Sequence, residues 1–149
     1  MFPEPLYRHG VYRTTKMWRE QAERYRLVGS HCKSCGQLWW PKRSGVCGKC
    51  NSRDLEDHEF KKEGVVTACF IESEQSPFEP LHGYEVYGDS RIMAIIKLDE
   101  GVYVGPTEIV DCTPDQAKEG LRVKMVTRKL RRESNGNWMY GYMWVIAKD

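Results

Sequence analysis

The chain of 149 residues is long enough for one ordinary domain, or for a small domain with an appendage. Its 23 basic and 21 acidic residues leave a formal net charge of +2, which argues against a strong overall field for nucleic acid or a membrane. Since no apolar run approaches the roughly 18 residues that a membrane-spanning helix needs, we expect no membrane association.

The N-terminal part combines an aperiodic stretch with one helical pattern. Residues 1–13 show no periodicity and predict an extended arm, after which Thr14 or Thr15 can cap a helix that runs to about Leu27 and stops at Gly29. One apolar stripe runs along this helix, at Trp18, Ala22 and Tyr25. So short a helix is not stable alone, so the stripe must pack on the rest of the chain or on another subunit.

Four cysteines form two Cys-x-x-Cys pairs separated by eleven residues: Cys32, Cys35, Cys47 and Cys50. Two pairs at this spacing, each with a nearby glycine, predict a zinc ribbon whose four thiolates close the coordination shell and leave a purely structural site. A disulfide framework requires an oxidising compartment, and the N-terminus does not resemble a signal peptide. A thioredoxin-like redox motif would be a single pair at the start of a helix, and here the pair is doubled and rich in glycine. Iron bound to the same four thiolates is also chemically possible. Reduced cysteines without a leader predict a cytoplasmic protein.

The segment between the pairs, Gln37–Arg43, predicts a short strand that ends in two cations. Consecutive residues of a strand point to opposite sides, so Trp39 and Trp40 are both buried only if both faces are covered. A zinc knuckle is too small to cover both. We therefore expect at least one tryptophan to pack on the neighbouring domain, a partner or a ligand. Lys42 and Arg43 can meet a phosphate or simply form a solvated strand end.

Strand signals recur from Glu56 onward, where no helix-length periodicity exists. The predicted strands are 64–71, 91–98, 102–110 with a bulge at Gly105-Pro106, a stretch from Leu121 that includes Arg128–Arg132, and a last strand with Trp138, Tyr140, Tyr142 and Trp144 on one face. A short helical or turn segment lies within 113–120, and Asn135-Gly136 signals a hairpin turn. Five strands in this order suggest a Greek-key barrel of the OB type, with the long loop 72–90 beside its binding face.

The predicted fold class is thus mainly β, in three parts. These are an N-terminal arm and helix (1–29), a rubredoxin-like zinc ribbon (30–55) and a five-stranded OB-fold barrel (56–149). The two remaining cysteines, Cys69 and Cys112, stand in apolar surroundings and are interpreted as packing residues. Neither has a nearby histidine in sequence or a glycine-rich elbow, so the chain alone is a poor candidate for thiol catalysis.

Several strings make the chain resemble a known family: Y-R-L-V-G-S-H-C-K-S-C-G, then W-P-K-R, then the second cysteine pair, and R-x-x-R-E-S-N-x-x-W-x-Y-x-Y near the end. The resemblance, from about Trp18 to Val145, is to the small zinc-ribbon/OB-fold proteins that accompany thiolase-superfamily enzymes. Members of that family include scaffolds between archaeal acetoacetyl-CoA thiolase and hydroxymethylglutaryl-CoA synthase. Others belong to diacetylphloroglucinol acyltransferase or to benzoylsuccinyl-CoA thiolase, and the segments 91–101, 108–111 and 131–135 look closer to these bacterial subunits than to the archaeal scaffolds.

The resemblance implies a non-catalytic subunit that carries structural zinc, binds a thiolase-type partner in a hetero-oligomer and helps to hold acyl-CoA. The partner would supply the active-site cysteine. Phosphate favours clustered cations, so the candidates for contacting CoA are Lys42, Arg43 and Arg91, together with Trp40.

Two other functions stay open from the residues. Zinc ribbons and OB barrels also bind single-stranded nucleic acid, and Arg128–Arg132 supports that alternative. In a regular strand, however, Arg128, Leu130 and Arg132 share one face and Lys129 and Arg131 the other, so the run makes no single cationic stripe. The second alternative is a freestanding acyl-CoA carrier.

Overall fold

The computed structural model describes residues 18–72, 91–132 and 138–147 of the chain. Four predicted features lie outside these ranges, so they stay predictions: the arm 1–13, the helix start at Thr14 or Thr15, the loop 72–90 beyond Glu72, and the hairpin turn at Asn135-Gly136. None of the helices in the described ranges combines the length and the apolar character that crossing a bilayer requires.

The described N-terminal helix, α2 (Gln21–Arg26), ends at about Leu27, as the sequence predicted. Leu27 terminates it in the left-handed conformation at φ 58°, and its N–H donates to the carbonyl of Glu23 at 3.1 Å. The residue that stops the helix is therefore Leu27, which is fully buried, and not Gly29 as the sequence predicted. Trp18 is 72% exposed, whereas Tyr25 is half-buried on a helix that contacts strand β8 of the barrel.

Three short antiparallel strands form the ribbon in the order β2-β1-β3: β1 (Val28–Cys32), β2 (Leu38–Trp39) and β3 (Leu55–Glu59). Gly29 lies in β1, where a Cβ would come within 2.3 Å of the Trp39 carbonyl oxygen and 2.6 Å of the Phe60 ring. Glycine is required here for the close approach of β1 to β2, not to end a helix.

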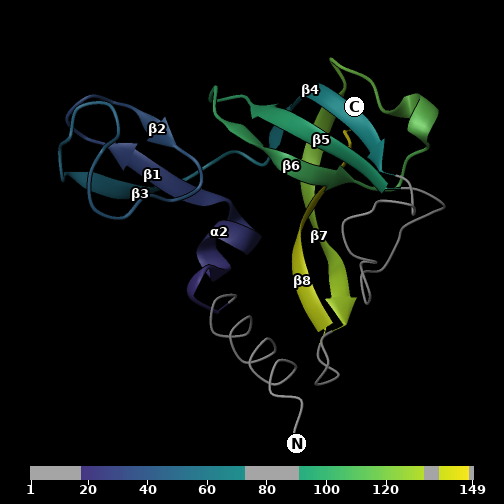
Figure 1. Ribbon diagram of the computed structural model, residues 1–149, viewed down its shortest axis with the longest axis horizontal. Coiled ribbons are helices and arrows are strands. Elements are labelled where there is room, and N and C mark those ends of the chain that lie inside the picture. Colours follow the sequence, from purple (N-terminus) through teal and green to yellow (C-terminus); the bar gives the residue numbers. More distant parts are fainter. Residues whose placement is uncertain (1–17, 73–90, 133–137, 148–149) are drawn as a thin grey trace, which may run out of the picture.

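The barrel consists of β4 (Glu63–Glu72), β5 (Arg91–Leu98), β6 (Tyr103–Ile109), β7 (Arg122–Arg132) and β8 (Trp138–Ile146), with a 3-10 turn at Pro114–Gln116 between β6 and β7. The strands close in the order β4-β5-β6-β8-β7 (Figure 1), with β6 and β8 parallel and the other pairs antiparallel. This is the strand order of an OB-fold, so the predicted fold class is confirmed. The bulge at Gly105-Pro106 is confirmed as well, opposite Ile95.

One hydrophobic core joins the barrel to the ribbon. Barrel residues such as Val66, Ile96, Val104 and Trp144 are at most 1% exposed. Leu27 and Phe60, which flank the ribbon strands, belong to the same buried cluster, and Leu38 packs against it. The Phe60 N–H donates to the Leu27 carbonyl at 3.1 Å. This hydrogen bond joins the residue before the first ribbon strand to the residue after the last one. The ribbon therefore packs on the barrel.

Candidate metal centre and its surroundings

The two cysteine pairs fold into matching turns because each has a residue that adopts positive φ directly after its second cysteine. Gly36 has φ 72° and donates its N–H to the Cys32 carbonyl at 2.8 Å, and Asn51 has φ 57° and donates to the Cys47 carbonyl at 2.9 Å. Glycine and asparagine tolerate this conformation better than other residues do. Each turn brings its two sulfurs to one side.

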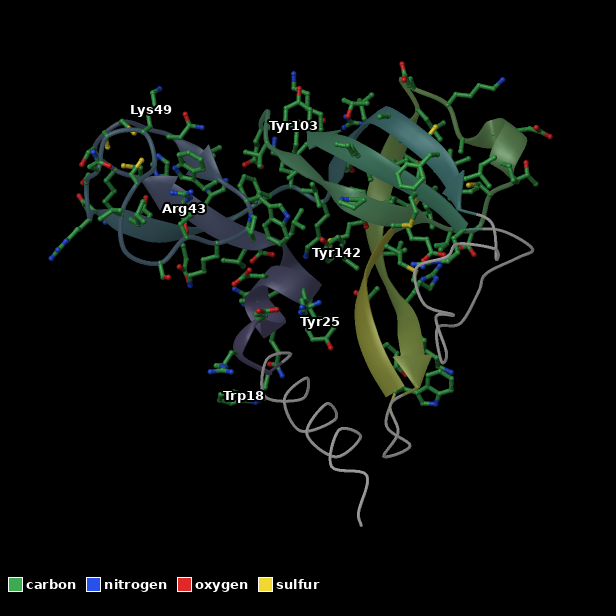
Figure 2. All side chains as sticks on the ribbon, viewed as in Figure 1. Trp18, Tyr25, Arg43, Lys49, Tyr103 and Tyr142 are labelled. Atoms are coloured by element: carbon green, nitrogen blue, oxygen red, sulfur yellow. The ribbon has the colours of Figure 1, made fainter. Side chains whose placement is uncertain are left out.

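The four sulfur atoms gather into one cluster at the knuckle end of the ribbon, near Lys49 in Figure 2, where Cys35 and Lys49 line a hollow together with Glu100 and Val102 at the β5–β6 turn of the barrel. All four lie within 4.8 Å of one another, with Cys32 and Cys50 3.6 Å apart and Cys35 and Cys47 3.7 Å apart. Tetrahedral zinc with Zn–S bonds of about 2.3 Å separates its sulfurs by about 3.8 Å. The predicted four-thiolate site therefore fits zinc in both ligand type and geometry.

Backbone groups prepare at least one of these sulfurs for a metal. The Lys49 N–H lies 3.4 Å from the Cys47 sulfur and is the main cause that lowers the pKa of Cys47 to about 6. The Ser52 N–H acts in the same direction on Cys50, but burial and the neighbouring thiols outweigh it and raise the pKa of Cys50 to about 12. A thiol with the pKa of Cys47 is mostly thiolate at neutral pH, the form that binds zinc. The site as a whole supplies folding energy rather than chemistry, because four protein ligands leave no position for a substrate.

The two tryptophans between the pairs face opposite sides, as the strand geometry predicted. Trp39 turns toward the second knuckle, where the Arg43 guanidinium stacks on it at 4.3 Å from the ring centroid and the side chain lies against Gly48. Trp40 turns toward the barrel and meets Phe60 and Tyr142 edge to face, at centroid distances of 6.4 and 6.1 Å. The expectation that one tryptophan packs on the neighbouring domain is confirmed for Trp40.

The predicted CoA contacts fall into two separate places. Lys42 and Arg43 follow the ribbon strand β2, where Lys42 pairs with Asp57 at 2.6 Å and Arg43 covers Trp39. Arg91 lies at the start of β5 and pairs with the carboxylate of Glu108, which is only 6% exposed, at 3.1 Å. Trp40 is linked to the Arg91 region through Tyr142, since Arg91 and Tyr142 line the same hollow.

That hollow has a volume of about 170 Å³ and also includes Arg24 of helix α2. It lies between α2 and the barrel, since Arg24 belongs to α2 and the other lining residues belong to β5, β6 and β8. Sequence reasoning missed Arg24, because a cation on the polar side of an amphipathic helix is indistinguishable from a solvated one. Its charge lies close enough to act on the Tyr142 hydroxyl, although burial is the main cause that raises the pKa of Tyr142.

A second feature that sequence reasoning missed is a set of hydrogen bonds between the ribbon and the barrel, centred on Glu100. Glu100, in the turn between β5 and β6, accepts hydrogen bonds from the Lys61 N–H at 2.8 Å and meets His58 Nε2 of β3 at 2.5 Å. Partial burial raises the pKa of Glu100, but the Lys61 N–H and His58 outweigh it and hold the pKa below its usual range. No sequence pattern brings His58 and Glu100 together, since 42 positions separate them.

Neither remaining cysteine is activated in the described structure. Cys69 is partly buried against the core and donates its S–H to the Ala117 carbonyl at 3.4 Å. Cys112 is also partly buried, and burial, aided by the charge of Asp111, raises the pKa of its thiol. A raised pKa is the opposite of what a nucleophilic cysteine needs. Both residues therefore behave as the packing residues that the sequence predicted.

Comparison with known proteins finds a matching family model, relatives of similar sequence and a solved structure of the same fold. The family model of the ChsH2 rubredoxin-like zinc ribbon domain matches residues 19–56. A DUF35 domain-containing scaffold protein of Pyrococcus furiosus is 36% identical over 130 residues, which cover 86% of this chain and 88% of that protein. Scaffold proteins with the same description are 34% identical in Methanothermobacter thermautotrophicus (87% and 92% covered) and in Methanocaldococcus jannaschii (85% and 86% covered).

Among solved structures, the fold is similar to one described as the Ltp2-ChsH2(DUF35) aldolase. The TM-score is 0.68 at 24% identity, with 89% of this chain and 94% of the other covered. This likeness extends over ribbon and barrel together and confirms the fold. With its zinc ribbon, its OB barrel and relatives above 30% identity over at least 86% of its length, the chain belongs to the DUF35-domain scaffold protein family.

Proposed function

We propose that this protein is a non-catalytic zinc subunit of a thiolase-type acyl-CoA complex, in which it binds the catalytic subunit and helps to hold acyl-CoA. The observation that carries the proposal is the 36% identity to a scaffold protein over 88% of that protein's length. A scaffold works through rigid surfaces, and a ribbon that shares one core with the barrel provides such a body.

The chemistry of the described residues supports a subunit that leaves catalysis to its partner. Thiolase-type acyl transfer needs a cysteine thiolate and hydrogen-bond donors for the developing oxyanion. Four cysteines are committed to the metal cluster, Cys69 is hydrogen-bonded to a carbonyl, and the pKa of Cys112 is raised. The nucleophile is therefore expected from the partner.

For acyl-CoA, we propose a site that only the complex completes. The hollow lined by Arg24, Arg91 and Tyr142 holds about 170 Å³, whereas sites for drug-sized ligands are about 300–1,000 Å³. CoA is larger still, so the hollow can take one part of it and the partner must enclose the rest. Arg91 lies in this hollow, and Lys42, Arg43 and Trp40 are the proposed contacts on the ribbon side. The acyl group and the direction of the carbon–carbon chemistry follow from the partner.

The test is reconstitution with the thiolase-type protein of the same organism. Each protein alone and the equimolar mixture are run on a sizing column with light scattering and assayed for acyl-CoA thiolysis. We expect a stable hetero-oligomer, no turnover by this chain alone, and full activity of a complex that carries Cys69→Ser and Cys112→Ser. Turnover by the isolated chain, or loss of activity in the double variant with its fold intact, would sink the non-catalytic assignment.

A further inference from the structure

Strands β7 and β8 continue well beyond the barrel. Strand β4 pairs with β7 only from Arg122 to Lys124, and β6 pairs with β8 only at Trp144. The β7–β8 pairing itself runs from Val123 opposite Ile146 out to Arg132 opposite Trp138. Residues 126–132 and 138–143 thus form a two-stranded extension that pairs with no other described strand, as Figure 1 shows below the barrel. We call these two segments the β7–β8 extension.

Two-stranded ribbons are marginally stable in water unless something covers one face. The inner end of the extension is covered, because helix α2 contacts β8 and Tyr142 meets Trp40. The outer end carries Trp138 and Tyr140, which are 38% and 41% exposed although both are large aromatic residues. Aromatic side chains in such positions are enriched where proteins meet a partner.

A bulge sets the cations on the extension in an order that the sequence did not predict. Lys129 stands opposite Tyr140, whereas Arg131 stands opposite Met139 and Arg132 opposite Trp138, so Leu130 is the extra residue. The bulge reverses the alternation after Leu130, and the prediction that Arg128 and Arg132 share a face is wrong. Lys129, which precedes the bulge, lies on the face that carries Trp138 and Tyr140, and its Nζ lies 4.7 Å from the centroid of the Trp138 ring. Arg132 occupies the position paired with Trp138 on that face.

The charge of the extension points to the chemistry of its occupant. Between residues 126 and 143 the sequence contains four cations, Arg128, Lys129, Arg131 and Arg132, against one carboxylate, Glu133. Arg128 already pairs with Asp111 at 2.8 Å, so three cations remain in excess of that pair. Cations on an edge strand also prevent strands from aggregating, and that function alone would account for lysine and arginine. It does not account for two aromatic residues on the same exposed face. A mixed aromatic and cationic face fits a protein surface with an apolar pocket surrounded by carboxylates.

We propose that the outer face of the β7–β8 extension, centred on Lys129, Trp138 and Tyr140, is the surface that docks on the catalytic subunit of the complex. The inference rests on the proposed scaffold function and adds where and how the partner binds. Trp138 enters an apolar pocket of the partner, and the carboxylates around that pocket face Lys129. Binding is consequently sensitive to ionic strength, since screening weakens exposed charge pairs.

The chain contains a matched control for this face. On the barrel, the Lys97 Nζ lies 5.8 Å from the ring centroid of Tyr103, which is 55% exposed. This second cation–aromatic pair has similar chemistry and lies on β5 and β6, away from the extension. Tyr103→Ala and Lys97→Glu therefore remove the same kinds of group without touching the proposed surface.

The experiment measures the affinity of the zinc-loaded chain for the purified thiolase-type subunit of the same organism by calorimetric titration, at low and high salt. Retention of zinc and the melting temperature show that each variant is folded. We expect Trp138→Ala to weaken binding about 30-fold or more, the usual effect of truncating a central aromatic anchor. Lys129→Glu should weaken binding and flatten its salt dependence, while Tyr103→Ala and Lys97→Glu leave both unchanged.

Three results would overturn the inference. If the wild-type chain binds but folded Trp138→Ala and Lys129→Glu bind equally well, the docking surface lies elsewhere and the scaffold function stands. If the control variants lose as much affinity, the extension has no special role. If the wild-type chain does not bind the subunit at all, the scaffold function itself fails. In that case, tight binding of a single-stranded oligothymidine by the wild-type chain, lost in Trp138→Ala, would assign this face to nucleic acid.

Discussion

Trp40 packs the ribbon against the shared core of the barrel, so its truncation tests whether the two parts are one body. Trp40→Ala removes a half-buried indole that meets Phe60 and Tyr142 edge to face. Truncating a fully buried aromatic residue costs about 3–5 kcal/mol, and aromatic pairs add about 0.5–1.5 kcal/mol each. Because Trp40 is only partly buried, we expect a loss of about 2–4 kcal/mol.

The assay is guanidinium unfolding of the zinc-loaded protein, followed by circular dichroism. A loss of about 3 kcal/mol lowers the midpoint by about 1 M for a protein of this size, and Trp40→Phe should recover most of it. Zinc content should not change, since the rings that Trp40 meets are those of Phe60 and Tyr142, and neither residue belongs to the four-cysteine cluster. A midpoint within about 0.2 M of the wild-type value would refute the shared core, and loss of zinc in Trp40→Ala would refute the separation of the metal cluster from the interface.

Three further predictions test other parts of the account. Cys35→Ser should lose zinc and the ordered ribbon, because structural zinc supplies about 10–16 kcal/mol in small zinc peptides, while barrel circular dichroism survives; a variant that keeps one equivalent of zinc contradicts this. Gly29→Ala should lower stability by about 1–3 kcal/mol in the same unfolding assay, since a Cβ would lie 2.3 Å from the Trp39 carbonyl oxygen, and an unchanged midpoint would show that β1 does not approach β2 so closely. Glu100→Gln should destabilise the protein by about 1–2 kcal/mol at pH 7. Because the folded-state pKa of Glu100 is lowered, its stabilisation is complete above the unfolded pKa of about 4.3 and is lost as the pH falls through the folded value. The difference from wild type should therefore shrink below about pH 4.

Much of the fold followed from local chemistry in the sequence. The cysteine spacing determined the knuckles, because Gly36 and Asn51 tolerate the positive φ that each turn requires. The β-branched runs of β4 and β5 and the bulge at Gly105-Pro106 were equally readable. In each case the signal lies within a few neighbouring residues.

What the sequence could not give depends on contacts between distant segments. Strand β3, with the sequence L-E-D-H-E, lacks a clear alternation because only its first and fourth residues are partly buried. The end of α2 at Leu27 is set by burial rather than by the glycine two positions later. The bulge at Leu130 lies in a run of cations with no glycine to mark it, so the face that carries Lys129 beside Trp138 appeared only in the structure.

The central claim is that this chain is a non-catalytic subunit of a thiolase-type complex, and one measurement tests it most directly. Thiolysis of an acyl-CoA is followed while the chain is titrated into a fixed amount of the thiolase-type subunit. We expect no turnover without that subunit, and activity that rises with the chain and saturates at a fixed stoichiometry. Activity that is independent of the added chain, together with separate elution of the two proteins, would contradict the account.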